Sequence, residues 1–213
     1  MRAMHLQYLE TDRRLAGPVE STVLELGIPQ SPLSAAILAE RLLFPVLEER
    51  QRLHALEVNE IKKAHPGLYT PPFPTFMPIA FLRKEVMDAA DTPESEINED
   101  VFISGLAARV GRLARDGSRY TVLKTAEYNE VKWARQTPGT TCAFCSMLAS
   151  RGPVWNVKKF RSHNGCDCTA VVVPDPNADW DGKREAQRLK ELWRHAGNMG
   201  KFRELLKEQV VLA

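Results

Sequence analysis

The stretch CAFCSMLASRGPVWNVKKFRSHNGCDC, residues 142–168, contains every cysteine of this 213-residue chain. It begins with Cys-x-x-Cys and ends, after 17 intervening residues, with His-x-x-Cys-x-Cys. A structural zinc ion takes four Cys or His ligands in a tetrahedron, and a tight Cys-x-x-Cys turn can offer two sulfurs to one ion. Side chains alternate along an extended chain, so the last two cysteines face the same side. The stretch therefore predicts a structural zinc site that organises the chain around it.

Five side chains compete for the four ligand positions of this predicted site. We expect Cys142, Cys145 and Cys166 to be ligands, with His163 and Cys168 competing for the fourth position. If all four cysteines bind the ion, His163 instead supports the site by contacting a ligand from outside.

Other chemistry for the same residues stays open. Disulfides are disfavoured because the start of the chain lacks a signal-peptide pattern, so we expect synthesis in a reducing cytosol. A redox Cys-x-x-Cys would need a strand before it and a helix after it, and residues 137–141 do not have the pattern of a strand. A catalytic cysteine with His163 as its base needs only one thiol. Buried cysteines without a metal are the remaining alternative.

Residues 1–130 have the pattern of a long helical region. Apolar residues recur at helical spacing, and Ser31 followed by Pro32 is typical of a helix start. We expect a helix break at Gly17-Pro18 and a kink at Pro45. The Pro-rich connector at 66–78 should be extended.

Two more helices are expected after an acidic break at residues 91–100. The first covers 101–116 and the second covers 119–136, with Gly117-Ser118 separating them. The short runs 153–157 and 169–173 are rich in β-branched or aromatic residues and predict strands.

The expected fold class is therefore α+β and mostly helical. Its parts are a helical N-terminal region over 1–130, a Cys/His module with a metal-stabilised β-hairpin over 131–180, and a C-terminal helix over 181–213.

Charge is distributed unevenly along the chain. Residues 1–100 hold 10 Lys/Arg against 16 Asp/Glu, whereas residues 101–168 hold 11 against 4. Within the basic part, Lys158, Lys159 and Arg161 are candidates for contacting nucleic-acid phosphates. The simpler interpretation is a solvated basic loop, or attraction between the two parts of the chain. We expect no membrane association, because no apolar run reaches the roughly 18 residues of a membrane span.

A longer motif resembles a known family. It comprises Arg135-x-Thr137, Cys142-x-x-Cys145-x-x-Leu148-x-x-x-Gly152, His163-x-x-Cys166-x-Cys168 and Val171-Val172-Val173-Pro174. This pattern resembles the MuF-like minor head proteins of tailed phages, in the form found in phages of actinobacteria. The resemblance covers about residues 133–174 and is only general over the N-terminal helices. The family commonly ends the motif with His-Pro-Asn-Cys-Arg-Cys, so the ligand residues are kept here while their neighbours differ.

The resemblance implies a minor capsid protein that acts in head morphogenesis or early DNA delivery. Expected partners are the portal protein and the major capsid protein, with packaged DNA as a further one. The expected location is the capsid interior or portal vertex of the virion, after assembly in the host cytoplasm. Some relatives are labelled capsid maturation proteases, so a protease is the main enzymatic alternative. No residue is nominated as catalytic by spacing, which favours a structural protein. A nucleic-acid-binding module or metal-dependent nuclease is the other alternative.

Overall fold

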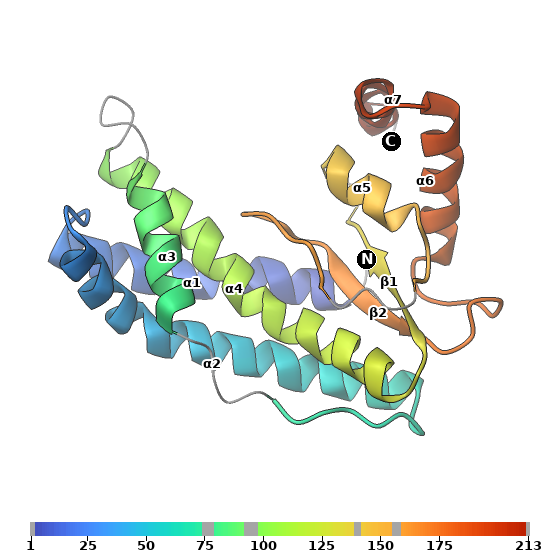
Figure 1. Ribbon diagram of the computed structural model, residues 1–213, viewed down its shortest axis with the longest axis horizontal. Helices are drawn as coiled ribbons and strands as arrows, with labels where there is room; N and C mark the ends of the chain where they lie inside the picture. The colour runs from blue at the N-terminus through green and yellow to red at the C-terminus, as the bar shows by residue number, and fades with distance from the viewer. Residues whose placement is uncertain (1–2, 74–78, 92–97, 139–141, 155–158, 212–213) are drawn as a thin grey trace.

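The computed structural model describes residues 3–73, 79–91, 98–138, 142–154 and 159–211. The predicted fold class is confirmed, because helices dominate and are accompanied by one small antiparallel sheet and C-terminal helices. Figure 1 shows four helices gathered on one side of the molecule, and the sheet with the last three helices on the other.

The helical side is built from α1 (Ala3–Leu26), α2 (Pro32–Ala64), α3 (Ile79–Ala90) and α4 (Glu99–Tyr128). Their apolar faces meet in one core, which burial from water stabilises. Its fully covered members include Val19, Leu38, Leu42, Val46, Leu82, Val86, Phe102, Leu106 and Val110.

The predicted ends of α2 are confirmed. The Ser31 side chain caps the helix by accepting from the Ser34 backbone N–H, and Pro32 occupies the first turn. The helix continues through Pro45 and ends at the C-cap His65.

The predicted break at Gly17-Pro18 is wrong, since α1 runs through it. Leu15, Val19 and Val23 are all buried at helical spacing on both sides of the proline. Packing against the bundle therefore holds the helix together across the one backbone hydrogen bond that Pro18 cannot make.

The predicted break at Gly117-Ser118 is also wrong, because α4 is one continuous helix. A Cβ atom on Gly117 would lie 2.5 Å from the backbone oxygen of Arg50 in α2. The glycine is thus a point of close approach between two helices rather than a helix end.

The predicted helix over 119–136 ends early. Asn129 is the C-cap of α4, Glu130 has a φ of 53°, and β1 follows at Lys132–Gln136. This strand pairs antiparallel with β2, Thr169–Val173, which was predicted as a strand. The two strands are joined by a long connection rather than by a hairpin turn, and that connection contains the Cys/His residues.

Within the predicted strand at 153–157, Val154 forms an isolated antiparallel bridge with Trp133. Residues 155–157 of this prediction lie outside the described part of the chain. The sheet packs on α4 through a second core shared by Ile61, Val122, Ala126 and Ala170.

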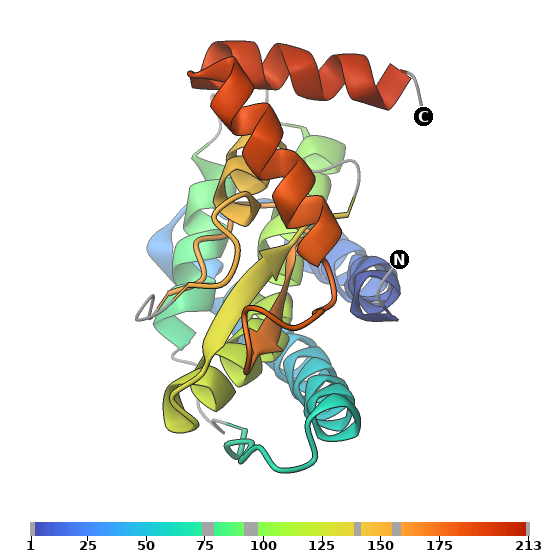
Figure 2. The same ribbon diagram turned by 90° about the vertical axis from the view of Figure 1, so that its right-hand side faces the viewer.

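Three helices complete the fold: α5 (Ala143–Ala149), α6 (Lys183–Ala196) and α7 (Met199–Val211). The predicted C-terminal helix corresponds to α6, which ends at Gly197 with a φ of 72°, and α7 continues beyond it. Figure 2 shows α6 and α7 crossing at one end of the molecule, above α5. Within the described residues, no helix is both long and apolar enough to cross a membrane.

Candidate metal centre

The five predicted ligand side chains gather in two groups of three that share Cys145. The Sγ atom of Cys142 lies 3.1 Å from Nε2 of His163. The Sγ atom of Cys145 lies 3.3 Å from the same nitrogen and 3.8 Å from Sγ of Cys166. The thiols of Cys145, Cys166 and Cys168 form a second close group. Spacing along the sequence thus translates into proximity in space.

Cys145 is the member common to both groups, Cys142–Cys145–His163 and Cys145–Cys166–Cys168. In each group the candidate ligand atoms lie within 4.8 Å of one another. A zinc ion with Zn–S bonds of about 2.3 Å in a tetrahedron separates its sulfurs by about 3.8 Å. The donor types and the separations within each group of three therefore suit zinc, and Cys145 is the donor that joins the two groups.

The Cys-x-x-Cys pair is presented by the start of a helix, which the sequence pattern did not predict. Cys142 is the N-cap of α5, and its sulfur accepts from the backbone N–H of Cys145 at 3.5 Å. The Cys142 sulfur therefore lies where the first turn of a helix leaves backbone N–H groups without carbonyl partners.

The ring orientation of His163 is fixed by its own loop. Its Nδ1 lies 2.8 Å from the backbone oxygen of Asn164, so Nδ1 carries the hydrogen and donates it. The Nε2 lone pair then faces the two sulfurs, as a metal-binding imidazole requires. Gly165 has a φ of 68°, and the backbone N–H of Cys166 returns to the oxygen of His163 at 3.0 Å. This turn brings the histidine and the two following cysteines to one side.

Burial divides the five side chains into an inner and an outer set. Cys145, Cys166 and Cys168 are sealed from water, whereas Cys142 and His163 are exposed. Inaccessible sulfurs suit a structural role, since a catalytic metal or thiol must be reached by a substrate.

A buried arginine from α4 supports the inner cysteines. Arg119 is 1% exposed and donates to the backbone oxygens of Cys166 at 2.7 Å and of Cys168 at 3.0 Å. It is also paired with Asp116 at 2.9 Å. The guanidinium therefore fixes the Cys166–Cys168 backbone and adds positive charge beside the sulfurs.

A second buried arginine, Arg135, also lies over the ring of Phe160. Arg135 from β1 lies 3.7 Å from the centre of that ring, and Arg119 lies 4.8 Å from it. Arg135 also points a nitrogen at Sγ of Cys145, 3.7 Å away, and donates to the backbone oxygen of Arg161. These contacts of two cations with one ring, together with the hydrogen bond to Arg161, hold the loop that leads to His163.

The inner thiols share hydrogen bonds that move their pKa values apart. Hydrogen bonds with Cys166 and Cys168, together with burial, raise the pKa of Cys145. The hydrogen bond with Cys145 lowers the pKa of Cys166, helped by the Arg119 charge. The hydrogen bond between Cys168 and Cys145 lowers the pKa of Cys168. The hydrogen bond with Cys166 and burial outweigh this effect and raise the pKa to about 12. Negative charge thus concentrates on Cys166, and a bound cation would displace the remaining shared protons.

As predicted, residues 137 and 138 do not lie in a strand, although a strand ends just before them. A strand, β1, does precede the motif, and a helix, α5, does follow it. The surroundings still differ from a two-thiol redox site, because Cys145 contacts a third and a fourth cysteine as well.

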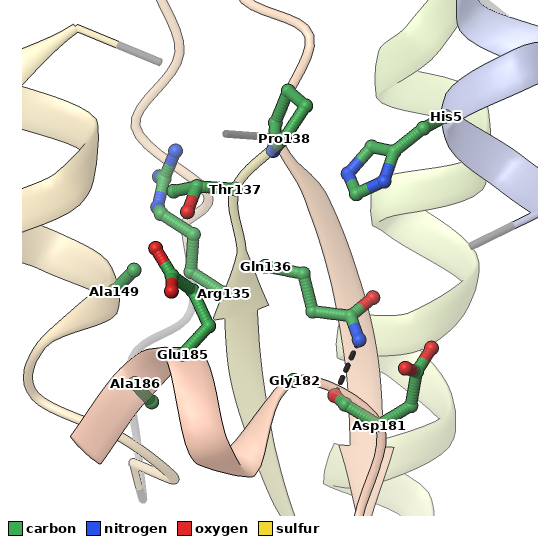
Figure 3. A pocket seen from close by; sticks show the side chains of 10 residues that line it. All are labelled: His5, Arg135, Gln136, Thr137, Pro138, Ala149, Asp181, Gly182, Glu185 and Ala186. Atoms are coloured by element: carbon green, nitrogen blue, oxygen red, sulfur yellow. Dashed lines mark hydrogen bonds between the residues drawn. The ribbon is translucent and has the colours of Figure 1, made fainter. Parts of the chain in front are cut away.

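The thiols do not face the cavity next to the sheet. This cavity of about 410 Å³ lies between β1, α6 and the start of α1, and His5, Arg135, Gln136 and Glu185 are among its lining residues (Figure 3). The Gln136 amide donates to the backbone oxygen of Asp181 across it. Among the described residues that line this cavity there is no cysteine.

Two of the three candidate nucleic-acid contacts lie on the surface beside the cluster. The side chains of Lys159 and Arg161 are exposed, whereas Lys158 lies outside the described part of the chain. No contact with nucleic acid follows from their exposure alone.

Sequence reasoning missed Arg119 and Arg135 as supports. Arg119 carries no local signal, because its hydrogen bonds reach the carbonyls of residues 47 and 49 positions away. The one sequence signal that could have indicated a buried role for Arg119 is the position of a charged residue on the apolar face of a helix. Arg135 was noted only as part of the family-like motif.

Comparison with known proteins places these residues in a family context. The model of the family described as VG15 protein matches residues 59–196, a range that contains all five Cys/His side chains. The Gene 15 protein of Mycobacterium phage D29 is 27% identical over 191 residues, covering 70% of this chain. The chain spans 65% of that protein's length. No solved structure matches.

Proposed function

The chain belongs to the VG15 family, and from this membership we propose that it is a structural protein of a bacteriophage particle. A relative is encoded by a mycobacteriophage, and the Cys/His pattern resembles that of MuF-like minor head proteins. The proposed role is a minor capsid component at the portal vertex, acting in head morphogenesis or early DNA delivery. Its proposed partners are the portal protein, the major capsid protein and the packaged DNA.

The observation that carries the structural role is the burial of three cysteines that contact one another. Cys145, Cys166 and Cys168 are closed off from water and backed by Arg119, so they are placed to hold a structural ion rather than to attack a substrate. We propose that the ion is zinc, because sulfur-rich tetrahedral sites select it.

The assembly role is tested by infecting cells with a phage that encodes a tagged copy of this chain. We expect the chain to co-purify with portal-containing procapsids and to remain in mature particles. A chain that never enters particles would contradict the proposal.

The zinc assignment is tested separately by elemental analysis of the purified chain. We expect about one zinc per chain, and a loss of zinc in Cys145→Ser. His163→Ala and Cys168→Ser decide the fourth ligand, because only the variant that lacks a true ligand should lose affinity strongly. A Ser146→Ala chain is the matched control beside the cluster.

A thiol protease is the second candidate, and one distance favours it. The exposed Sγ of Cys142 lies 3.1 Å from His163 Nε2, within reach for proton transfer. Incubation with unprocessed capsid protein tests this alternative. Cleavage that survives metal chelation but is lost in Cys142→Ala would establish a protease, whereas no cleavage supports the structural role.

The nucleic-acid alternative, a DNA-binding module or nuclease, rests on the exposed Lys159 and Arg161. A titration of the pure chain with duplex DNA over a range of salt concentrations tests it. The absence of binding at low salt would remove this alternative.

A further inference from the structure

A groove of about 320 Å³ is lined by residues of β1, of α5 and of the segments that follow α5. Its apolar wall is formed by Trp133 of β1, by Met147 and Leu148 of α5, and by Val154. Phe144, which is 40% exposed, stands at the edge. The groove has room for one apolar side chain and the backbone on either side of it.

Three exposed cations line this groove. They are Arg151, which follows α5, and Lys159 and Arg161, which precede His163. Among the described residues, no Asp or Glu lines the groove, and none of these three cations takes part in an ion pair. Most other surface cations of α1 and α2 are paired, for example Arg41 with Glu25. These rim cations therefore offer uncompensated positive charge beside an apolar pocket.

We propose that this groove binds an extended acidic segment of a partner protein, inserting one apolar side chain between flanking Asp or Glu residues. The apolar wall supplies affinity by burying that side chain, and the rim cations supply orientation and encounter rate. The chain itself then presents the docking surface through the same segments that hold the Cys/His cluster.

A protein segment fits this groove better than single-stranded nucleic acid does. Nucleic acid binds such surfaces by stacking successive bases on exposed aromatic faces. Here Trp133 is only 7% exposed, and Phe160 packs against its ring at 5.7 Å. Phe144 remains as a single exposed ring, while Met147 and Leu148 suit an aliphatic or aromatic side chain.

The site is tested with the pure full chain and a fluorescein-labelled peptide in which glutamates flank a single leucine. We expect saturable binding by fluorescence anisotropy that weakens as salt is raised. Replacing the peptide's leucine by serine should weaken binding about tenfold, since burial of a leucine contributes roughly that much. Arg151→Glu and Lys159→Glu should each weaken binding about fivefold. The matched control is Lys201→Glu, an exposed cation of α7 away from the groove, which should leave binding unchanged.

Three results would overturn the proposal. The first is no binding, or binding that ignores both the leucine and the two rim variants. The second is tighter binding of a single-stranded oligonucleotide with the same number of charges. The third is self-association of the chain that the rim variants abolish, which would assign the groove to a second copy. Circular dichroism of each variant confirms that the helices are intact. The peptide assay does not depend on particle assembly, so its failure leaves the proposed virion role to its own test.

Discussion

Two buried arginines show how single residues support the cluster without touching the predicted ion. Arg119 acts on the Cys166 and Cys168 carbonyls, and Arg135 acts on the Cys145 sulfur and on Phe160. A thiolate-rich site carries net negative charge, so neighbouring guanidiniums lower the cost of placing several sulfurs together. Arg119 stays charged despite its burial, because interactions with Tyr8, Asp116 and Cys166 raise its pKa above the usual value and outweigh desolvation.

Replacing Arg119 by methionine should therefore destabilise the protein strongly. Arg119→Met leaves two buried carbonyls without their donor and leaves Asp116 with only its more distant contacts to Arg112 and Ser162, a loss that typically costs about 3 kcal/mol. Urea unfolding followed by circular dichroism measures the loss. The control is Arg203→Met on the exposed surface of α7, which should change stability by less than about 0.5 kcal/mol. Equal effects of the two variants would contradict a supporting role for Arg119.

His54 makes the bundle sensitive to mild acid. Its Nδ1 lies 2.6 Å from the hydroxyl of Thr121, and burial followed by repulsion from Arg50 lowers its pKa. Because the pKa of His54 is lower in the folded chain than in the unfolded chain, the unfolded chain takes up the proton at a higher pH as the solution is acidified. Stability is therefore present above about pH 6.5 and falls as the pH drops through the depressed folded-state pKa.

We expect His54→Gln to lose less stability than the parent chain between about pH 7.5 and pH 5.5. Thermal unfolding at both values measures the difference, and comparison with the parent cancels the contribution of other histidines. The exposed His195→Gln is the control and should follow the parent chain. If His54→Gln also followed the parent, titration of His54 would not be linked to folding.

The proximity of the Cys/His side chains was predictable because it depends on side-chain type and on spacing over a few positions. The Cys-x-x-Cys pair and the His163–Cys168 segment each contribute candidate ligands from a short stretch of chain. Their supports were not predictable, since Arg119 and the cysteines it orders are far apart in sequence and meet only through tertiary packing.

At the scale of elements, the approach of α4 to α2 depends on one glycine. Gly117→Ala would bring a Cβ atom to 2.5 Å from a backbone oxygen of α2 that cannot rotate away. We expect a loss of about 1–3 kcal/mol from overpacking. The matched control is Gly105→Ala in the same helix, where nothing lies within 4 Å and helix propensity should stabilise the fold by about 0.5–1 kcal/mol. Urea unfolding measures the free energy of unfolding of both variants. A loss in Gly117→Ala with a gain in Gly105→Ala would support the close approach of the two helices, whereas a gain in both variants would contradict it.

Local signals predicted some elements well and others not at all. The Ser31–Pro32 start of α2 was predicted correctly, because a helix cap is made by neighbouring residues. Pro18 and Gly117 were misread as breaks, because buried neighbours and interhelical contact outweigh their low helix propensity. Strand β1 was read as helix because its partner, β2, lies more than thirty positions later.

At the scale of the whole molecule, the bundle and the Cys/His region should respond differently to metal removal. The bundle has its own apolar core, whereas the cluster packs around sulfurs. Chelation should therefore leave most helical circular dichroism intact while β1 and β2 gain hydrogen exchange. Free metal at about 1,000 times its dissociation constant should add about 4 kcal/mol to the free energy of unfolding of the Cys/His region. This corresponds to an increase of roughly 10 °C in the unfolding temperature of the region. Uniform exchange across α1–α4 and the sheet would contradict this division.

The long connection between β1 and β2 gives the cluster a consequence for the order of folding. Pairing Gln136 with Thr169 closes a loop of more than thirty residues, and the entropy lost on closure opposes that pairing. An ion held jointly by Cys145 and Cys166 would tie the connection together close to both strand ends, leaving only a short span on each side to be ordered. Metal capture would then come before strand pairing, and a chain made without metal would complete its helical bundle first and its sheet last.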